Sequence, residues 1–321
     1  MAIAETTTGG VLCELIRCPI CRGDLELTEQ GWQCQNVVCG EIHATVDGVP
    51  ILLNERNSVF EAATFLDRQP TFFKPRGRVR ALFSDWLPTI DRNVAARRVL
   101  SRLREMLLED CLQPTVLVLG GGILGEGMEV MAREQRVDLI ETDVSLGPRT
   151  RVICDAHDLP FADACFDAVI VQATLEHVVD PVECVAEIER VLKPNGLVYA
   201  DTPFMQQVHG REYDFTRFTR LGHRRLFRNF AEVESGISVG PGTALAWSLR
   251  YFLLSFCRSR AARGIASGLA RLAFSWLKTF DRHLAGKPGA CDAASAFYFL
   301  GRKTNAALSD RDLIAGYRGG F

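Results

Sequence analysis

The order of short apolar runs and helical stretches between residues 115 and 203 constrains the fold of this 321-residue chain most strongly. Four runs in this part are apolar on both faces, namely 115–121, 137–143, 167–173 and 196–203. Such runs are typical of parallel strands whose sheet is covered by helices on both sides. Helical patterns at 129–135 and 181–196 alternate with them. The pattern therefore predicts an α/β fold with right-handed crossovers.

Changes in composition and periodicity along the remaining sequence divide the chain into segments. Residues 93–111 have helical spacing, with Asn93 as the expected N-cap, and residues 295–303 read as one more strand. We predict four segments with these bounds: an N-terminal module at 1–53, a helical linker or lid at 54–113, the α/β domain at 114–305 with a helical insertion at about 243–288, and a C-terminal tail at 306–321.

Composition narrows the functional classes. The 37 lysines and arginines nearly balance the 39 aspartates and glutamates, so the net charge is −2. A generally basic nucleic-acid-binding protein is therefore not indicated, although a local basic patch fits within this balance. The first residues lack the signal-peptide pattern, and no uncharged apolar stretch of about 18 residues occurs. We expect a cytoplasmic protein in which the 11 cysteines serve as metal ligands or buried thiols rather than disulfides.

Four cysteines lie close together near the N-terminus: Cys18, Cys21, Cys34 and Cys39. Two thiolate pairs separated by a hairpin complete the tetrahedral shell that Zn²⁺ prefers, and a shell of four cysteines leaves no open position for catalysis. We predict a structural zinc site, and the alternative is four structural thiols without metal. Gly31 is expected near the turn of the hairpin between the two pairs.

Residues 12–53 resemble the small zinc-ribbon modules of bacterial proteins and the related methyltransferase-activator proteins. The resemblance rests on CPICRGDLEL, on WQCQNVVCGEIHATV and on the DGVPILL ending. The four-residue gap between Cys34 and Cys39 departs from the usual two-residue gap.

A glycine-rich loop directly follows the first strand of the α/β segment. Gly120 and Gly122 allow the chain to turn sharply and allow a ligand to approach the backbone. About twenty residues later Asp143 ends the second strand, where a carboxylate can accept hydrogen bonds from both ribose hydroxyls of an adenosine cofactor. The alternatives are a tight turn without a ligand and an Asp143 that caps the next turn.

Residues 115–235 resemble class I S-adenosylmethionine-dependent methyltransferases of the small-molecule type, on the block DAHDLPFADACFDAVIVQATLEHVVDPVECVAEIERVLKPNGLVYADTP. The resemblance implies a Rossmann-like sheet of seven strands whose last strand is antiparallel. It also implies six cofactor-binding residues: Gly120 and Gly122 at the methionine portion, Asp143 at the ribose, Asp155 and Ala156 at the adenine, and Gln172 after the fourth strand.

Two features depart from that family. Val118 replaces the usual acidic residue before the first glycine, and Leu124 stands where a third glycine often lies. Because the sulfonium of the cofactor is cationic, we expect Glu126 or Glu141 to compensate its charge.

The loop that follows the fifth strand carries the candidate catalytic residues. His209 is the candidate general base, since imidazole has an ordinary pKa of about 6.5. Asp214 is expected to orient it or to bind sugar hydroxyls, Arg217 to hold a phosphate or carboxylate, and His177 is the reserve base. The loop resembles, more loosely, that of methyltransferases encoded with cell-surface glycan and secondary-metabolite pathways. The alternative is a polar lid packed by its aromatic residues.

Residues 243–288 are rich in arginine, lysine and large apolar side chains, with Asp281 as their one acid. Basic amphipathic helices with tryptophan suit an anionic membrane surface. The alternatives are a helical hairpin packed on the domain or in a dimer interface and, least favoured, nucleic-acid binding.

Together these observations predict an enzyme that uses S-adenosylmethionine and a structural zinc ion. We expect it to methylate a hydroxyl of a glycan, a lipid-linked sugar or a related metabolite. The alternatives are a ribosomal or transfer RNA base methyltransferase with a zinc ribbon, and a methyltransferase-like binding scaffold without activity. The sequence does not indicate an oligomeric state.

Overall fold

The computed structural model describes residues 7–71 and 86–320, and its centre is a seven-stranded sheet. The strands are β6 (Thr115–Leu119), β7 (Asp138–Asp143), β8 (Val152–Ile153), β9 (Phe166–Gln172), β10 (Leu192–Pro203), β11 (Phe230–Val239) and β12 (Ala296–Lys303). They lie in the order β11-β12-β10-β9-β6-β7-β8, and β12 is antiparallel to both of its neighbours. The predicted seven-stranded sheet with an antiparallel last strand is confirmed.

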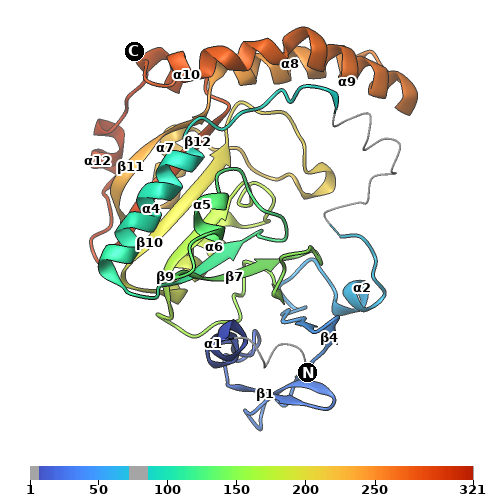
Figure 1. Cartoon of the computed structure of the whole chain (residues 1–321), viewed down its shortest axis with the longest axis vertical. Coiled ribbons are helices and arrows are strands. Elements are labelled where there is room, and N and C mark those ends of the chain that lie inside the picture. The colour runs from blue at the N-terminus through green and yellow to red at the C-terminus, as the bar shows by residue number, and fades with distance from the viewer. Residues whose placement is uncertain (1–6, 72–85, 321) are drawn as a thin grey trace.

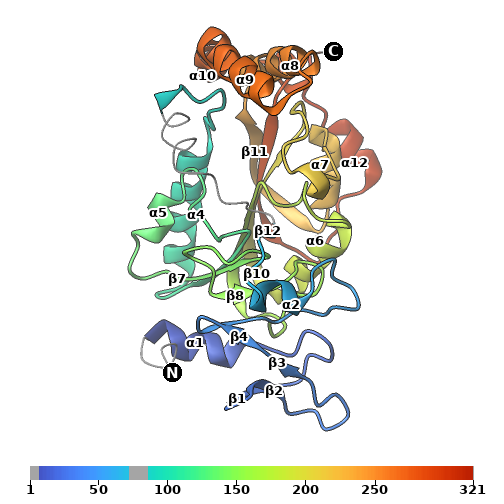
Figure 2. The same ribbon diagram turned by 90° about the vertical axis from the view of Figure 1, so that its right-hand side faces the viewer.

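Helices cover both faces of this sheet (Figure 2). On one face α4 (Ala96–Asp110) and α5 (Glu129–Ala132) cover Val116 and Tyr199, and on the other α6 (Pro181–Val191) and α7 (Arg220–Leu226) cover Leu117 and Val169. The strands are apolar on both faces for this reason, since each face packs against a helical layer.

Local sequence signals explain most element ends. Asn93 caps α4 as predicted, because its Oδ1 accepts hydrogen bonds from the amides of Ala95 and Ala96 at 3.0 and 2.8 Å. Two predicted helices are shorter than expected. The helix predicted at 181–196 ends at Val191, because Leu192 already pairs with Phe166 of β9. The helix predicted at 129–135 is the single turn α5.

The N-terminal module, residues 7–53, contains one short helix and five short strands. They are α1 (Thr7–Leu15), β1 (Leu25–Thr28), β2 (Gly31–Cys34), β3 (Ile42–His43), β4 (Thr45–Val46) and β5 (Val49–Pro50). The predicted hairpin is confirmed, with Gly31 at φ +132° beside its turn. Ile51 bridges to Ile153 at the sheet edge, and Leu52 is buried in the same core as the strands. The module therefore packs directly on β8.

The predicted insertion lies between β11 and β12 and is helical. Its elements are α8 (Pro241–Ser255), α9 (Arg260–Phe274), the 3-10 turn η2 (Ser275–Phe280), α10 (Asp281–Leu284) and α11 (Pro288–Cys291). We call residues 241–291 the helical insertion. It lies at the end of the molecule opposite the N-terminal module (Figure 1). Among the described residues, no helix is both long and apolar enough to cross a membrane. The remaining helices are α2 (Ala62–Leu66), the 3-10 turn η1 (Arg211–Tyr213) and α12 (Asp310–Ala315).

Candidate functional site

The glycine-rich loop turns directly after β6 at the edge where the parallel strands end. Gly120 has φ +71°, and a side chain there would collide with the Thr174 hydroxyl. The amide of Gly122 donates to Asp143 Oδ2 at 2.9 Å, so the loop after β6 is tied to the end of β7. Only glycine meets both demands at position 120, because the backbone is left-handed and space is absent.

Four of the six predicted cofactor residues line one cavity of about 70 Å³: Gly120, Asp143, Asp155 and Ala156. Gly122 lies behind Asp143 through its hydrogen bond. Gln172 lines a small neighbouring cavity that shares Gly120 with the first. The structure therefore brings the six residues together around one edge of the sheet, as the sequence predicted for a cofactor site.

The carboxylate of Asp143 is almost enclosed, with 6% of the residue exposed. Burial raises the pKa of Asp143 to about 6, because the charged form loses hydration there. A buried carboxylate at the end of the second strand is strongly stabilised when two hydroxyl groups donate hydrogen bonds to it. The ribose of an adenosine cofactor supplies such a pair of hydroxyl groups.

Residues before the α/β domain complete the side of the cavity that Asp155 lines. Ser58 Oγ donates to Asp155 Oδ2 at 2.6 Å, while His157 Nδ1 lies 2.5 Å from Asp155 Oδ1. Burial alone would raise the pKa of Asp155, but the hydrogen bonds from His157 and Ser58 lower it. Phe60 lines the cavity and stacks on Tyr213, with ring centroids 5.3 Å apart.

Ser58 and Phe60 were missed by sequence reasoning, since no motif places them near the cofactor. The only signal was the expectation that residues 54–113 include a lid. Ligand pockets commonly measure about 300–1,000 Å³, whereas the cavity that Phe60 and Tyr213 line measures about 70 Å³.

The neighbouring cavity, on the Gln172 side of the site, contains one buried polar atom without a hydrogen-bond partner among the described residues. This atom is Gln172 Oε1, while Gln172 Nε2 donates to the Glu126 carbonyl at 3.1 Å. An ammonium group of a cofactor would satisfy that oxygen, so the residues present fit S-adenosylmethionine. Glu141 is paired with Arg149 at 2.6 Å, and its charge is already balanced. The Glu126 carboxylate accepts from the Asn93 amide at 3.2 Å.

Three titratable side chains meet beside the cofactor cavity: Glu176 and His177 after β9, and His209 after β10. The Nε2 atoms of both histidines lie 3.7 Å from Glu176 Oε1, and the two rings are nearly perpendicular with centroids 4.9 Å apart. His177 Nδ1 lies 2.7 Å from the Tyr213 carbonyl, and donating to it leaves Nε2 as the acceptor nitrogen. The Glu176 side chain is 1% exposed, and among the described residues its Oε2 has no hydrogen-bond partner.

The cluster has the electrostatics of an acid–base group, because the pKa values of its two histidines shift in opposite directions. Burial lowers the pKa of His177. Burial also opposes the charging of His209, but Glu176, the Gln207 carbonyl and Asp214 together outweigh it, so the pKa of His209 is raised above its ordinary value. The three side chains also have residue types found in metal sites, with ligand atoms within 4.8 Å of one another. No other feature of the described residues points to an ion there.

Asp214 stabilises the backbone of the acceptor loop, residues 204–217. Its Oδ2 accepts from the amides of His209 and Gly210 at 2.6 and 2.8 Å, and its Oδ1 pairs with Arg217 at 2.5 Å. Burial would raise the pKa of Asp214, but Arg217 and the amides lower it to about 2. The His209 ring lies 3.7 Å from Asp214 and 3.7 Å from Glu176. Asp214 therefore positions His209 through the main chain, and Arg217 is engaged within the loop.

The helical insertion forms the outer wall of this loop. Tyr251 Oη donates to the Val208 carbonyl at 2.5 Å, Gln207 Nε2 donates to Ser248 Oγ at 3.1 Å, and the Trp247 ring lies 6.2 Å from His209. One face of α8 therefore packs on the domain. Sequence reasoning did not place Trp247 and Tyr251 beside this loop, because their contacts span about 40 residues.

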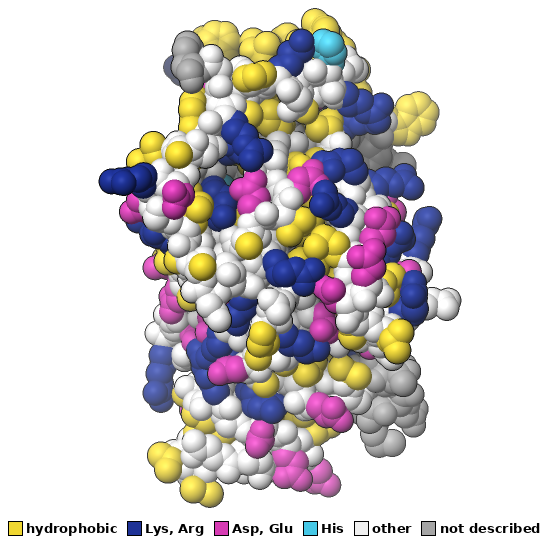
Figure 3. Space-filling view, turned by 90° about the vertical axis from the view of Figure 1, so that its left-hand side faces the viewer, with side chains coloured by type: hydrophobic (Ala, Val, Ile, Leu, Met, Phe, Trp, Pro, Cys, Tyr) yellow, Lys and Arg dark blue, Asp and Glu magenta, His cyan; other side chains and the backbone are white. Residues whose placement is uncertain are grey.

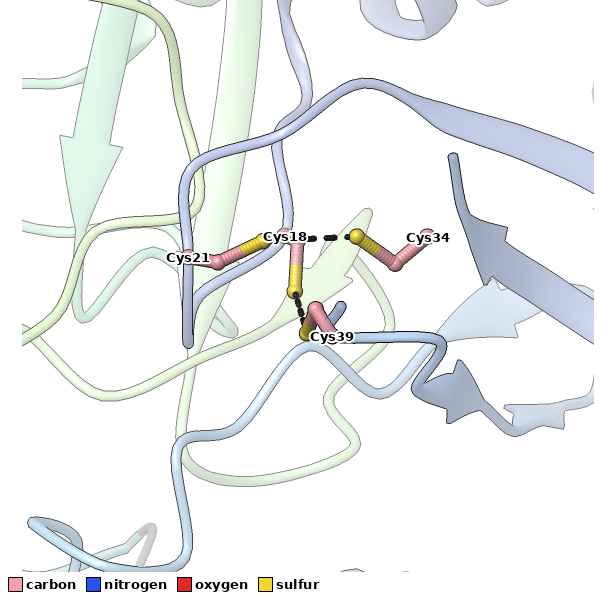
Figure 4. Close-up of side chains that lie close together, drawn as sticks. All are labelled: Cys18, Cys21, Cys34 and Cys39. Carbon is pink, nitrogen blue, oxygen red and sulfur yellow. Dashed lines mark hydrogen bonds between the residues drawn. The ribbon is translucent and has the colours of Figure 1, made fainter. Parts of the chain in front are cut away.

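The four predicted metal ligands converge in the N-terminal module (Figure 4). The sulfur atoms of Cys18 and Cys39 are 3.8 Å apart, those of Cys21 and Cys34 are 3.3 Å apart, and all four lie within 4.8 Å of one another. Sulfurs at about 2.3 Å from a tetrahedral zinc ion are about 3.8 Å apart, so the cluster fits this metal. The donor set is closed and lies in the module at the far end of the molecule from the insertion.

Comparisons with known proteins agree with this arrangement. Residues 121–200 match the family described as a methyltransferase domain. A demethylmenaquinone methyltransferase of Clavibacter sepedonicus is 28% identical over 177 residues, which are 53% of this chain and 66% of that protein. The ubiquinone/menaquinone biosynthesis C-methyltransferase UbiE of Desulfotalea psychrophila is 50% identical over 96 residues, 29% of this chain and 38% of that protein. This chain thus aligns with less than two thirds of the length of either relative.

Solved structures that match this chain are more distant in sequence. A phosphoethanolamine N-methyltransferase of Haemonchus contortus is 16% identical, with a TM-score of 0.40 over 64% of this chain and 53% of that one. A 1,6-didemethyltoxoflavin N1-methyltransferase of Burkholderia thailandensis is 15% identical, with a TM-score of 0.40 over 74% of this chain and 94% of that one.

Proposed function

We propose that this protein transfers a methyl group from S-adenosylmethionine to an acceptor whose hydroxyl is deprotonated by His209. One observation carries the proposal: the His209 imidazole lies 3.7 Å from a buried Glu176 carboxylate and packs edge to face against His177, which lines the cofactor cavity. A base is thereby held beside the place where a methyl donor would lie, with a carboxylate that stabilises its protonated form.

The residues of the cavity supply binding and orientation. Asp143 would hold the ribose, Asp155 and Ala156 the adenine, and Gln172 the methionine ammonium. When bound, S-adenosylmethionine provides a methyl group already activated by the sulfonium. The protein therefore needs only to align the acceptor and remove its proton.

His209 supplies the proton-removing step. The acceptor proton passes to Nε2 as the acceptor gains the methyl group, and the imidazolium that forms is stabilised by Glu176. Asp214 keeps the ring in place by fixing the backbone amides of His209 and Gly210. Asp214 is thus a positioning residue, and His177 is the second imidazole of the cluster.

We favour O-methylation of a hydroxyl on a glycan, a lipid-linked sugar or a related metabolite. A second candidate is C-methylation of a quinol ring, which the names of two relatives support. Both reactions begin by deprotonating a hydroxyl, since the oxygen anion is either the nucleophile itself or the donor that makes a ring carbon nucleophilic. The Trp247 and Tyr251 rings, stacked 5.7 Å apart beside the acceptor loop, suit either a sugar face or a ring.

The test is transfer of labelled methyl groups from S-adenosylmethionine to glycan, lipid and RNA extracts, followed by magnetic resonance to tell O-methyl from C-methyl products. We expect His209→Ala to lower turnover about a hundredfold or more with unchanged affinity for S-adenosylhomocysteine. His283→Ala, at an exposed position in α10, is the matched control and should behave as wild type.

The pH profile provides a second readout. Because the pKa of His209 is raised, the wild-type rate should fall as the pH drops through a value above 6.5. In Glu176→Gln that fall should move to lower pH, because the carboxylate that favours the imidazolium is gone. Near wild-type turnover in His209→Ala would assign the base elsewhere. A protein that binds no S-adenosylhomocysteine would be a scaffold, and a methylated product found only in the RNA extract would indicate an RNA methyltransferase.

A further inference from the structure

The helical insertion exposes large apolar side chains along two neighbouring helices. Leu245 and Phe252 on α8 and Phe256 directly after it recur at helical spacing. On α9 the exposed residues are Ile265, Leu269 and Leu272, and Trp276 and Phe280 follow in η2. Each of these eight residues is between 49% and 73% exposed. Spacings of three, four and seven place such residues on one face of a helix. Scattered exposed apolar residues are ordinary, but two aligned rows mark an interaction surface.

The charges of the insertion have one sign at its surface. It contains eight lysines and arginines, of which Arg258, Arg260, Arg263, Arg282 and Lys287 are exposed. Its one acid, Asp281, is fully buried and accepts hydrogen bonds from the Gly242 amide at 2.7 Å and the Thr243 hydroxyl at 2.6 Å. Hydrophobic and basic side chains gather at this end of the molecule (Figure 3).

The difference in charge between the helical insertion and the rest of the chain would orient the molecule at a charged surface. The whole chain has a net charge of −2, so the residues outside the insertion are net acidic. An anionic surface would therefore attract the insertion end and repel the rest of the molecule.

We propose that the exposed face of α8 and α9 binds the surface of an anionic lipid bilayer, with its apolar rows in the interface and its arginines at the headgroups. Apolar burial and attraction to acidic lipids together are the features of such interfacial helices.

Two other occupants fit the surface less well. A second copy of the chain would place arginines against arginines, with no surface carboxylate of either insertion to neutralise them. RNA would pair with the arginines but would leave Ile265, Leu269 and Leu272 without an apolar partner. A bilayer satisfies both the charges and the apolar rows.

The position of the surface bears on the acceptor. The same helix α8 that exposes Phe252 outward packs Trp247 and Tyr251 on the acceptor loop. A helix is about 10 Å across, so a bound bilayer would lie about that far from the loop. This points to an acceptor carried in the membrane, an inference that rests on the proposed methyl transfer, whereas membrane binding itself does not.

The experiment is co-sedimentation of the full chain with vesicles, measured without cofactor or acceptor so that catalysis does not influence it. One set contains phosphatidylcholine with phosphatidylglycerol, and the other contains phosphatidylcholine alone. We expect binding at least tenfold tighter to the anionic vesicles, weakened by added salt. The double variant Leu269→Ser, Leu272→Ser should lose at least tenfold in affinity while keeping its melting temperature.

Two further variants separate the two contributions. Val37→Ser with Val38→Ser removes equally apolar residues, 95% and 92% exposed, from the N-terminal module and should bind as wild type. Arg258→Gln with Arg260→Gln should lose the preference for anionic vesicles. The proposal is overturned if wild type does not sediment with anionic vesicles or if the Leu269, Leu272 variant binds unchanged. Two other results would also overturn it. One is a dimer, seen by light scattering, that the same leucine substitutions abolish. The other is RNA binding, seen by gel shift, that they abolish.

Discussion

Asp143 links cofactor affinity, stability and pH in a way that one substitution can test. The carboxylate is buried at the end of β7, its pKa is raised to about 6, and it accepts the Gly122 amide at 2.9 Å. Asp143→Asn keeps a carbonyl oxygen for that amide and removes the charge. The variant should therefore separate the electrostatic role of Asp143 from its part in holding the glycine loop.

The expected effect on stability follows from the sign of the pKa shift. A carboxyl whose folded-state pKa lies above its unfolded value of 3.8 binds its proton more tightly when folded, so ionisation disfavours the folded state as the pH rises through about 6. A shift from 3.8 to about 6 corresponds to about 3 kcal/mol. Asp143→Asn, which is never charged, should thus stabilise the cofactor-free protein at pH above 7 by up to that amount.

The expected effect on affinity is opposite. Ribose hydroxyls bind the ionised carboxylate best, and charge-assisted hydrogen bonds are about twice as strong as neutral ones. Two such bonds weakened to neutral strength lose roughly 1.5–3 kcal/mol, or about 10- to 100-fold in affinity. In wild type, affinity should be constant above pH 7 and decrease by up to about tenfold per pH unit below about 6.

Calorimetric titration with S-adenosylhomocysteine from acidic to alkaline pH, together with denaturant unfolding, measures both quantities. Asp143→Asn should bind weakly at every pH, without the acid-dependent loss. Asp138→Asn, at the other end of the same strand, is the control and should keep the wild-type profile. If Asp143→Asn bound with wild-type affinity, or were less stable than wild type at neutral pH, the assignment of the ribose site would be wrong.

Three further outcomes are expected elsewhere in the molecule. Protein purified without chelator should contain one zinc ion per chain by elemental analysis, and Cys21→Ser should contain less; wild type free of stoichiometric zinc would contradict this. Asp281→Ala should lower the free energy of unfolding by at least about 3 kcal/mol, because three buried hydrogen bonds to a carboxylate are lost; unfolding at the wild-type denaturant concentration would refute the stabilising role of these bonds. Phe60→Ala should release S-adenosylhomocysteine several-fold faster in stopped-flow experiments, because the ring no longer covers the cavity; an unchanged rate would mean that exchange does not require this contact to open.

The strands β6, β7, β9 and β10 were predictable because each lies in a run that is apolar on both faces, with helical patterns at 129–135 and 181–196 between them; β8 and β11 carry no such signal. The same logic predicted the grouping of Gly120, Asp143 and Asp155, since neighbouring parallel strands end at one edge of the sheet. The details that depend on tertiary packing were not predictable. Asp214 is close to His209 in sequence but bonds its backbone amide, while Glu176, 33 residues away, faces its ring.

The wall of the cofactor cavity includes chain that precedes the domain matching the methyltransferase family. Ser58 and Phe60 belong to the segment that follows the N-terminal module. The module is joined to β8 where Leu52 donates its amide to the Ile153 carbonyl at 2.8 Å. Ile153 lies two residues before Asp155. A recombinant fragment starting at residue 114 would keep Asp155 yet lose the hydroxyl bonded to it and the ring that covers the cavity. Any event that frees the cysteine-bearing module from β8 would likewise open the Asp155 side of the cavity to solvent. The boundary of a sequence family is in this protein a poor guide to where the chain can be cut.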